Sequence, residues 1–119
     1  MKCKTLFGLV LAGLLSISGL AAASVREETS SAINYKMRYP VVTVEKNAAA
    51  QTAINEDIQK YVDNFLTQYK TGKFRKGDFS YKLRYEDDQV ISLTLQDYRF
   101  NQGAAHGYTN TYGVNYSKI

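Results

Sequence analysis

Residues 47–72 read NAAAQTAINEDIQKYVDNFLTQYKTG, and this stretch decides the fold. Apolar side chains recur here at intervals of three and four residues, which predicts an amphipathic helix from about Ala48 to Lys70. Asn47 can accept a hydrogen bond from an early helical N–H, and Gly72 tolerates the left-handed backbone that often follows a helix. The expected apolar face consists of Ala50, Ile54, Ile58, Tyr61, Val62, Phe65 and Tyr69. The expected solvent face carries Asn55, Glu56, Gln59, Lys60 and Asp63.

Segments in which apolar and polar residues alternate flank this helix. A period of two predicts strands with one buried face. The predicted strands are 33–39, 41–44, 79–85, 90–100 and 108–116. In the first of them, Ile33, Tyr35, Met37 and Tyr39 share one face, and the acidic group at 86–89 predicts a hairpin turn. We therefore predict an α+β domain in which one long amphipathic helix packs on an antiparallel β-sheet.

The strand predicted at 90–100 changes character along its length. Ile91, Leu93 and Leu95 lie on one face, while Tyr98 and Phe100 bring aromatic rings to the other. Two alternatives remain open for this change: both faces are covered near Tyr98, or a bulge alters the orientation of the strand.

The first 23 residues have the order of a secretory signal peptide. Lys2 and Lys4 precede an uncharged apolar run, and residues 21–23 are the small alanines that a signal peptidase accepts. We expect cleavage between Ala23 and Ser24, which would leave a secreted or periplasmic protein without a stable membrane span. A retained membrane anchor is the alternative, because the apolar run is just long enough to cross a bilayer.

The polar segment at 24–31 shows no periodicity and predicts a flexible lead-in to a domain at 32–119. Beyond Ala23 the chain has 13 basic and 11 acidic residues, because Lys2 and Lys4 belong to the signal, and its net charge is then +2. The signs of the charges alternate, so we expect no nucleic-acid partner.

Residue types limit the chemistry that the domain can perform. The only cysteine, Cys3, lies in the signal, and His106 is the only histidine. No Gly-x-Ser-x-Gly motif marks a nucleophile, and the acidic group at 86–88 lacks the spacing of a calcium-binding loop. We expect no catalytic residue, metal site or cofactor, and hence no enzyme. His106 is expected to bond to local backbone, in a loop where Gly103 and Gly107 permit backbone angles or close approaches that other residues resist.

The chain contains ten tyrosines and no tryptophan. Most of the tyrosines occupy strand positions or the apolar face of the helix, where the ring fills a core and the hydroxyl stays at its edge. Tyr108 and Tyr112, just beyond the Gly-rich loop, are candidates to line a binding surface for carbohydrate or protein.

Several short motifs occur together along the chain. They are Tyr39-Pro40, Ala53-Ile54-Asn55, Ile91-Ser92-Leu93, Gly103-Ala104-Ala105-His106-Gly107 and Asn115-Tyr116. With the signal, this combination resembles the PdaC-type domain of unknown function, over about Ile33 to the end. That domain occurs in bacterial peptidoglycan deacetylases and in ectodomains like that of the RsiV anti-sigma factor. Ala104 departs from the Gly-Gly-Ala-His-Gly pattern that opens a companion domain in such proteins, and we expect the companion to be truncated here.

The resemblance implies an exported accessory or sensing domain at the bacterial cell envelope, with peptidoglycan or an envelope protein as its partner. It also implies that Gly103, His106 and Gly107 form a family-motif loop that serves structure and offers a position for binding. The polysaccharide deacetylase module with its metal-binding His and Asp residues has no counterpart here, so the resemblance does not carry over that activity.

Two alternatives to this function stay open. One is the N-terminal part of an envelope deacetylase or hydrolase whose catalytic module lies outside this chain. The other is a protein that senses or inhibits lysozyme. Lysozymes are typically basic, and a net charge of +2 provides no long-range attraction to them, so only a local acidic patch such as residues 86–88 would compensate.

Overall fold

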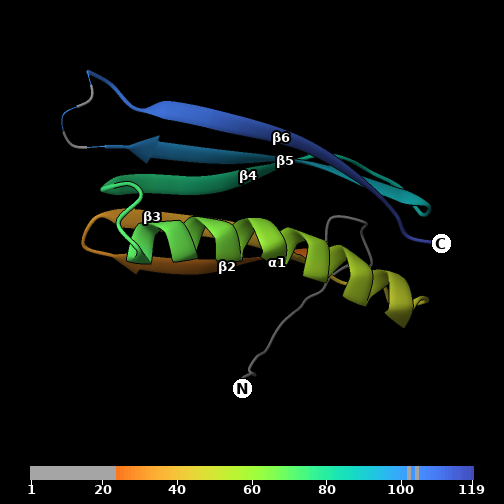
Figure 1. The fold of residues 1–119 in the computed structure, drawn as a ribbon. Coiled ribbons are helices and arrows are strands. Elements are labelled where there is room, and N and C mark those ends of the chain that lie inside the picture. The colour runs from red at the N-terminus through yellow and green to blue at the C-terminus, as the bar shows by residue number, and fades with distance from the viewer. Residues whose placement is uncertain (1–23, 102, 104) are drawn as a thin grey trace.

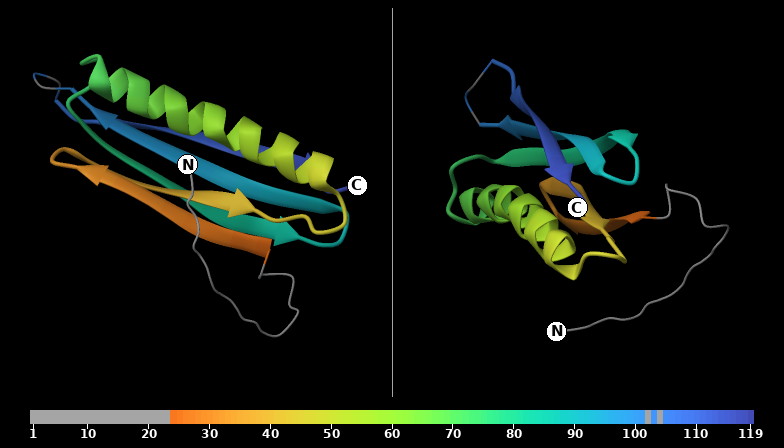
Figure 2. Two further views of the ribbon diagram at one scale, coloured as in Figure 1. Left: turned by 90° about the horizontal axis from the view of Figure 1, so that it is seen from below. Right: turned by 90° about the vertical axis from the view of Figure 1, so that its right-hand side faces the viewer.

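The computed structural model describes residues 24–101, 103 and 105–119. Its elements are β2 (Val25–Ala32), β3 (Tyr35–Val42), α1 (Ala48–Lys70), β4 (Lys76–Glu86), β5 (Val90–Phe100) and β6 (Tyr108–Ser117). The strands form one sheet in the order β2-β3-β4-β5-β6, and α1 lies along it (Figures 1 and 2). The predicted α+β class is confirmed. The predicted signal at residues 1–23 lies outside the described residues.

Helix α1 has the predicted bounds and the predicted caps. The Asn47 side-chain oxygen accepts from the N–H of Ala50 at 3.0 Å, which satisfies one donor of the first turn. At the other end Gly72 has a φ of +80°, and its N–H donates to the carbonyl of Tyr69. The chain therefore leaves the helix through a left-handed glycine, as its sequence predicts.

One pair of strands in the sheet is parallel. Residues 35–37 of β3 lie beside 77–79 of β4 in parallel register, whereas every other neighbouring pair is antiparallel. Because α1 carries the chain back along the sheet after β3, β4 starts at the same end as β3 and runs in the same direction. The predicted antiparallel sheet is thus corrected at this one pair.

The prediction of a flexible lead-in at 24–31 is wrong, because Val25–Ala32 form the edge strand β2. This strand pairs with the whole of β3, from Val25 opposite Val42 to Ala32 opposite Tyr35. Its side chains are mostly polar and partly or fully exposed, so backbone hydrogen bonds hold it and no apolar alternation marks it. Ile33, which we expected on a buried face, instead lies in the turn after β2 and is 97% exposed.

Strand β3 continues through Pro40 instead of breaking there. Pro40 has no N–H to donate, but the pairing of β3 with β4 has already ended at Met37. No ladder on the β4 side therefore needs a donor from Pro40. The two extended pieces predicted at 33–39 and 41–44 are one strand that ends at Val42.

Two side chains of α1 form hydrogen bonds with the backbone of the chain beyond the point where the pairing of β3 with β4 ends. Asn55 accepts from the N–H of Val42 and donates to its carbonyl, both at 2.8 Å. Gln51 accepts from the N–H of Val44 at 2.9 Å. Asn55, expected on the solvent face, is therefore partly buried, because its amide completes the backbone hydrogen bonding that β4 no longer provides.

The core lies between α1 and the sheet. Its buried apolar residues are Met37, Val42, Val44, Ile54, Ile58, Val62, Phe65, Phe74, Phe79, Ile91, Leu93, Leu95 and Val114. The Phe65 ring is fully buried, with ring centroids of Phe74 at 5.0 Å and Phe79 at 5.7 Å. A register shift does occur in the β4–β5 pair, but it lies between Leu83 and Tyr85 and not near Tyr98.

Candidate binding site

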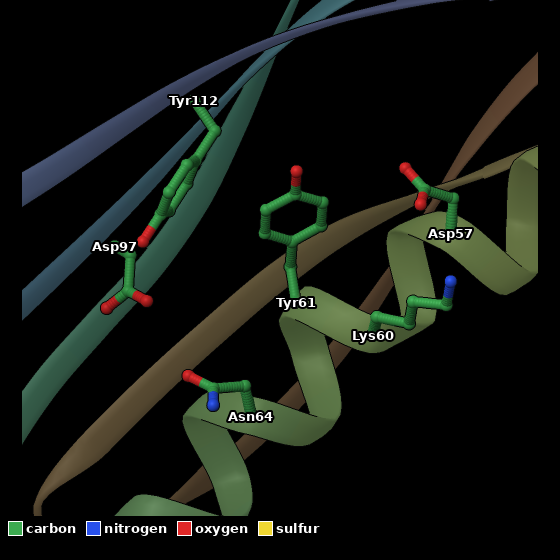
Figure 3. Close-up of a pocket in the computed structure, with 6 residues that line it drawn as sticks. All are labelled: Asp57, Lys60, Tyr61, Asn64, Asp97 and Tyr112. Carbon is green, nitrogen blue, oxygen red and sulfur yellow. The ribbon is translucent and has the colours of Figure 1, made fainter.

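A hollow of about 290 Å³ lies between α1 and the strands β5 and β6 (Figure 3). It is lined by Asp57, Lys60, Tyr61, Asn64, Asp97 and Tyr112. We call this feature the α1–β6 hollow. Sites for small ligands usually measure about 300–1,000 Å³ and place a few polar groups beside apolar or aromatic surface. The α1–β6 hollow is slightly smaller than this range and has this mixed composition.

The helix presents four of these residues because of their spacing. Asp57, Tyr61 and Asn64 are separated by four and three positions, so they lie on one side of α1, next to the buried stripe. Figure 3 shows Asp57 and Tyr61 rising from α1 toward the strands, with Tyr112 and Asp97 on the opposite side. The lining therefore comes from elements far apart in the sequence.

Tyrosines join α1 to β6 along this hollow. The ring centroids of Tyr61 and Tyr112 lie 4.9 Å apart, with the rings inclined by 49°. The hydroxyl of Tyr116 donates to Oδ2 of Asp57 at 2.7 Å. Burial of the Tyr116 ring, and then this hydrogen bond, raise the pKa of Tyr116 above its usual value.

One lining residue, Asp97, belongs to a buried ion pair. Asp97 and Arg99 are 3% and 6% exposed, and the guanidinium donates through Nε and Nη2 to the two carboxylate oxygens, each at 2.8 Å. Arg99 also donates to Gln68 at 2.6 Å and to Asn64 at 3.0 Å, and its guanidinium lies 4.9 Å from the centroid of the Phe74 ring. The hydrogen bonds to Asp97 raise the pKa of Arg99, although burial opposes them.

This pairing gives the hollow a fixed acceptor. Arg99 holds the Asp97 carboxylate in place, and Asp97 also lines the hollow. A carboxylate oxygen can accept more than one hydrogen bond, so Asp97 can receive a donor from a ligand without losing Arg99. The arrangement can therefore bind a molecule that offers hydroxyl or N–H groups next to a face suited to an aromatic ring.

The sequence identified only part of this site. Tyr112 was a candidate for a binding surface and lines the hollow, whereas Tyr108 is 52% exposed and does not line it. Asp97 and Arg99 were missed as a pair. The sequence pattern that could have revealed them is the alternation along β5, because both residues continue the buried face that carries Leu95.

The Gly-rich loop lies apart from the lining of the hollow. Gly103 has a φ of +94°, a backbone angle that L side chains rarely adopt, and a Cβ on Gly107 would lie 2.5 Å from Cε1 of the Tyr98 ring. His106 is exposed, and its Nδ1–H donates to the carbonyl of Gly107 at 3.0 Å. A binding role for this loop stays a prediction.

The acidic group at 86–88 forms the predicted hairpin turn but is not an open acidic patch. The Glu86 side chain is buried, with the ammonium of Lys118 at 2.8 Å. Asp87 accepts from the Tyr85 hydroxyl at 2.7 Å and from two backbone N–H groups of the turn, and these bonds lower the pKa of Asp87, with the bond from Tyr85 contributing most. Two of the three carboxylates are thus already engaged.

Two further observations concern the part of the chain that the structure describes. Within residues 24–101, 103 and 105–119, no group of three or more His, Cys, Asp and Glu side chains is placed to hold a metal ion. In the same residues no helix is long and apolar enough to cross a membrane.

Comparison with known proteins identifies the family. A protein-family model described as Deacetylase PdaC matches residues 26–109. The chain belongs to the PdaC family. The match begins in β2 and ends early in β6, so it includes Asp57 and Asp97 but stops before Tyr112. A search of curated proteins gave no match.

Proposed function

We propose that this PdaC domain is a non-catalytic binding module of the bacterial cell envelope, and that it binds an envelope glycan in the α1–β6 hollow. One observation carries the proposal: the paired rings of Tyr61 and Tyr112 stand beside a carboxylate, Asp97, that Arg99 holds in place. The predicted secretory signal would bring the domain to the envelope. The family name refers to a deacetylase. The role proposed for this domain is to bind a glycan and not to catalyse its deacetylation.

A sugar has the two kinds of surface that this hollow matches. Its ring presents C–H groups that pack on an aromatic face, and its rim carries hydroxyls that donate and accept. Tyr61 and Tyr112 supply the rings, while Asp57, Asn64 and Asp97 supply acceptors or donors around them. The hollow is a small concavity, which favours one part of a glycan chain over the broad surface of a protein partner.

The hydrogen bonds of the two carboxylates support binding over acid–base catalysis. A general acid or base must gain and lose a proton during the reaction. Asp97 already accepts two hydrogen bonds from the guanidinium of Arg99. Asp57 already accepts the hydroxyl of Tyr116. Both carboxylates are therefore arranged as fixed acceptors.

Binding to purified peptidoglycan tests this proposal. Residues 24–119 should sediment with the insoluble polymer, and soluble oligomers of N-acetylglucosamine should compete. We expect Tyr112→Ala to weaken binding by at least about tenfold, because the variant loses a stacked aromatic contact and the apolar area that this contact buries. Tyr85→Ala is the matched control, because the Tyr85 ring is 55% exposed and does not line the α1–β6 hollow. This variant should bind within about twofold of wild type.

Other outcomes point to the alternatives. Equal binding by the Tyr112 and Tyr85 variants, each shown to be folded by circular dichroism, would move the site away from the α1–β6 hollow. Release of acetate from acetylated peptidoglycan by residues 24–119 would contradict the non-catalytic role. Retention of lysozyme in place of glycan would favour a sensor or inhibitor.

A further inference from the structure

The side chain of Glu86, at the end of β4, has one oxygen without a donor. This side chain is 4% exposed. Its Oε2 accepts from the Lys118 ammonium at 2.8 Å and from the hydroxyl of Ser24. Its Oε1 is buried, and no described residue donates to it. Buried carboxylate oxygens are normally hydrogen-bonded, so the position calls for a further donor.

Ser24 is fixed beside this carboxylate. Its carbonyl accepts from the N–H of Thr43 at 2.7 Å, and its hydroxyl donates to Glu86. The backbone nitrogen of Ser24 is bonded to the same Cα that carries this hydroxymethyl group. It therefore lies three covalent bonds from the hydroxyl oxygen that donates to Glu86.

The predicted cleavage site gives that nitrogen a special chemistry. Hydrolysis of the Ala23–Ser24 peptide bond by a signal peptidase adds water, leaves a carboxylate on Ala23 and frees the amine of Ser24. The ordinary pKa of an α-amino group is about 8, so at neutral pH the amine takes up a proton and becomes an ammonium with three N–H donors. Before cleavage the same nitrogen is an uncharged amide with a single N–H.

We propose that Glu86 is the receiving site for the α-ammonium of Ser24, which donates to the unpartnered Oε1 once the leader is removed. The carboxylate has acceptor positions for both this ammonium and Lys118. Removal of the leader then completes the hydrogen bonding of a buried group and stabilises the mature domain relative to its precursor. This inference rests on the proposed cleavage before Ser24 and is independent of glycan binding.

Two forms of one chain test the contact directly. Residues 24–119 include every described core residue, so they can be prepared with Ser24 as the first residue, either free or N-acetylated. Acetylation removes the charge and two donors. Because a hydrogen bond between charged groups is worth about 1.5–3 kcal/mol, acetylation should lower the folding equilibrium constant by about tenfold or more.

The same comparison in Glu86→Gln separates this contact from other effects of acetylation. In that background acetylation should change the folding equilibrium constant by less than about twofold, because the amide no longer offers an ionic acceptor. No effect of acetylation in the wild-type chain would overturn the proposal. An equal effect in both chains would also overturn it.

Nuclear magnetic resonance titration of the Ser24 amine in the unmodified chain needs no variant to fold. Glu86 should raise the pKa of that amine above its ordinary value of about 8, against the opposing charge of Lys118 and with Asp87 also nearby. An ordinary or lowered value overturns the contact. Intact-mass analysis of the exported protein tests the cleavage separately, and a first residue other than Ser24 overturns the maturation step.

Discussion

Arg99 shows how much a single buried side chain can depend on its partners. It is 6% exposed and donates to Asp97, Gln68 and Asn64. Removing one member of a buried ion pair leaves the other charge without compensation. We predict that Arg99→Leu lowers the free energy of unfolding by about 3–5 kcal/mol, measured by urea denaturation. Arg75→Leu, at an exposed arginine, should change it by less than about 0.5 kcal/mol.

A small effect of Arg99→Leu would contradict this assignment. A loss of less than about 1 kcal/mol would mean that water or another cation compensates Asp97, and that Arg99 does not fix the acceptor of the α1–β6 hollow.

Two glycines in strands differ in what an added side chain would meet. A Cβ on Gly77 would lie 2.6 Å from Cζ of Phe65 and 2.7 Å from Cε2 of Phe74, whereas a Cβ on Gly113 would have nothing within 4 Å. We predict that Gly77→Ala costs about 1–3 kcal/mol of stability, because the core rings must shift. Gly113→Ala should be neutral or slightly stabilising, because it lowers the entropy of the unfolded chain. Thermal unfolding of both variants measures the difference, and equal midpoints would contradict the packing around Gly77.

At the scale of whole elements, Asn55 couples α1 to β3. Its amide bonds to both backbone groups of Val42 at 2.8 Å, where β3 has no neighbouring strand on the β4 side. We predict that Asn55→Ala lowers the free energy of unfolding by about 1–3 kcal/mol, because these two groups lose their partner. Gln59→Ala, at an exposed position one turn further along α1, should cost less than about 0.5 kcal/mol.

Hydrogen exchange provides an independent reading of the same coupling. The amide of Val42 should exchange faster in Asn55→Ala than in wild type, while amides in the middle of β5 keep their protection. Unchanged exchange at Val42 would show that the Asn55 bond does not hold the end of β3.

The elements differ in how far the sequence predicts them, and the reason is physical. Helix α1 could be bounded to the residue because its apolar period, its Asn47 cap and Gly72 act locally and agree. Strand β2 could not be predicted, because its polar side chains carry no period and its pairing partner supplies the stability. Asn55 was misplaced for the same reason: its polarity suggested solvent, but its partner is backbone that only the folded sheet brings near.

The residues of the candidate site also differ in how far the sequence predicts them, for the same physical reason. Tyr112 could be nominated from its position after the Gly-rich loop, because an aromatic residue close to a loop is a local feature of the sequence. Asp97 and Arg99 satisfy each other across two residues of one strand, and their burial depends on α1 lying over them. The α1–β6 hollow needs α1, β5 and β6 in place together, so no local pattern contains it.

At the scale of the whole molecule, tyrosines with raised pKa values are spread over the sheet. Burial is the first cause at Tyr39, Tyr81 and Tyr116, which lie on β3, β4 and β6. At Tyr85 the first cause is the hydrogen bond to Asp87. In each case the folded protein disfavours the ionised phenolate more than the unfolded chain does, so these residues link folding to alkaline pH.

The direction of that link follows from where the protons are bound. Above a pH of about 10, the ordinary tyrosine value, the unfolded chain releases phenolic protons that the folded protein retains, so stability falls as pH rises. We predict that the free energy of unfolding is insensitive to these groups below about pH 9 and declines between about pH 10 and 12.

Tyr116→Phe removes the group with the largest rise in pKa, so the free energy of unfolding of this variant should decline less steeply with pH. At pH 8 that free energy should be lower than the wild-type value by about 1 kcal/mol, because the hydrogen bond to Asp57 is lost. Urea midpoints at pH 8 and 11 measure these slopes, and equal slopes for wild type and Tyr116→Phe would show that Tyr116 does not resist ionisation in the folded protein.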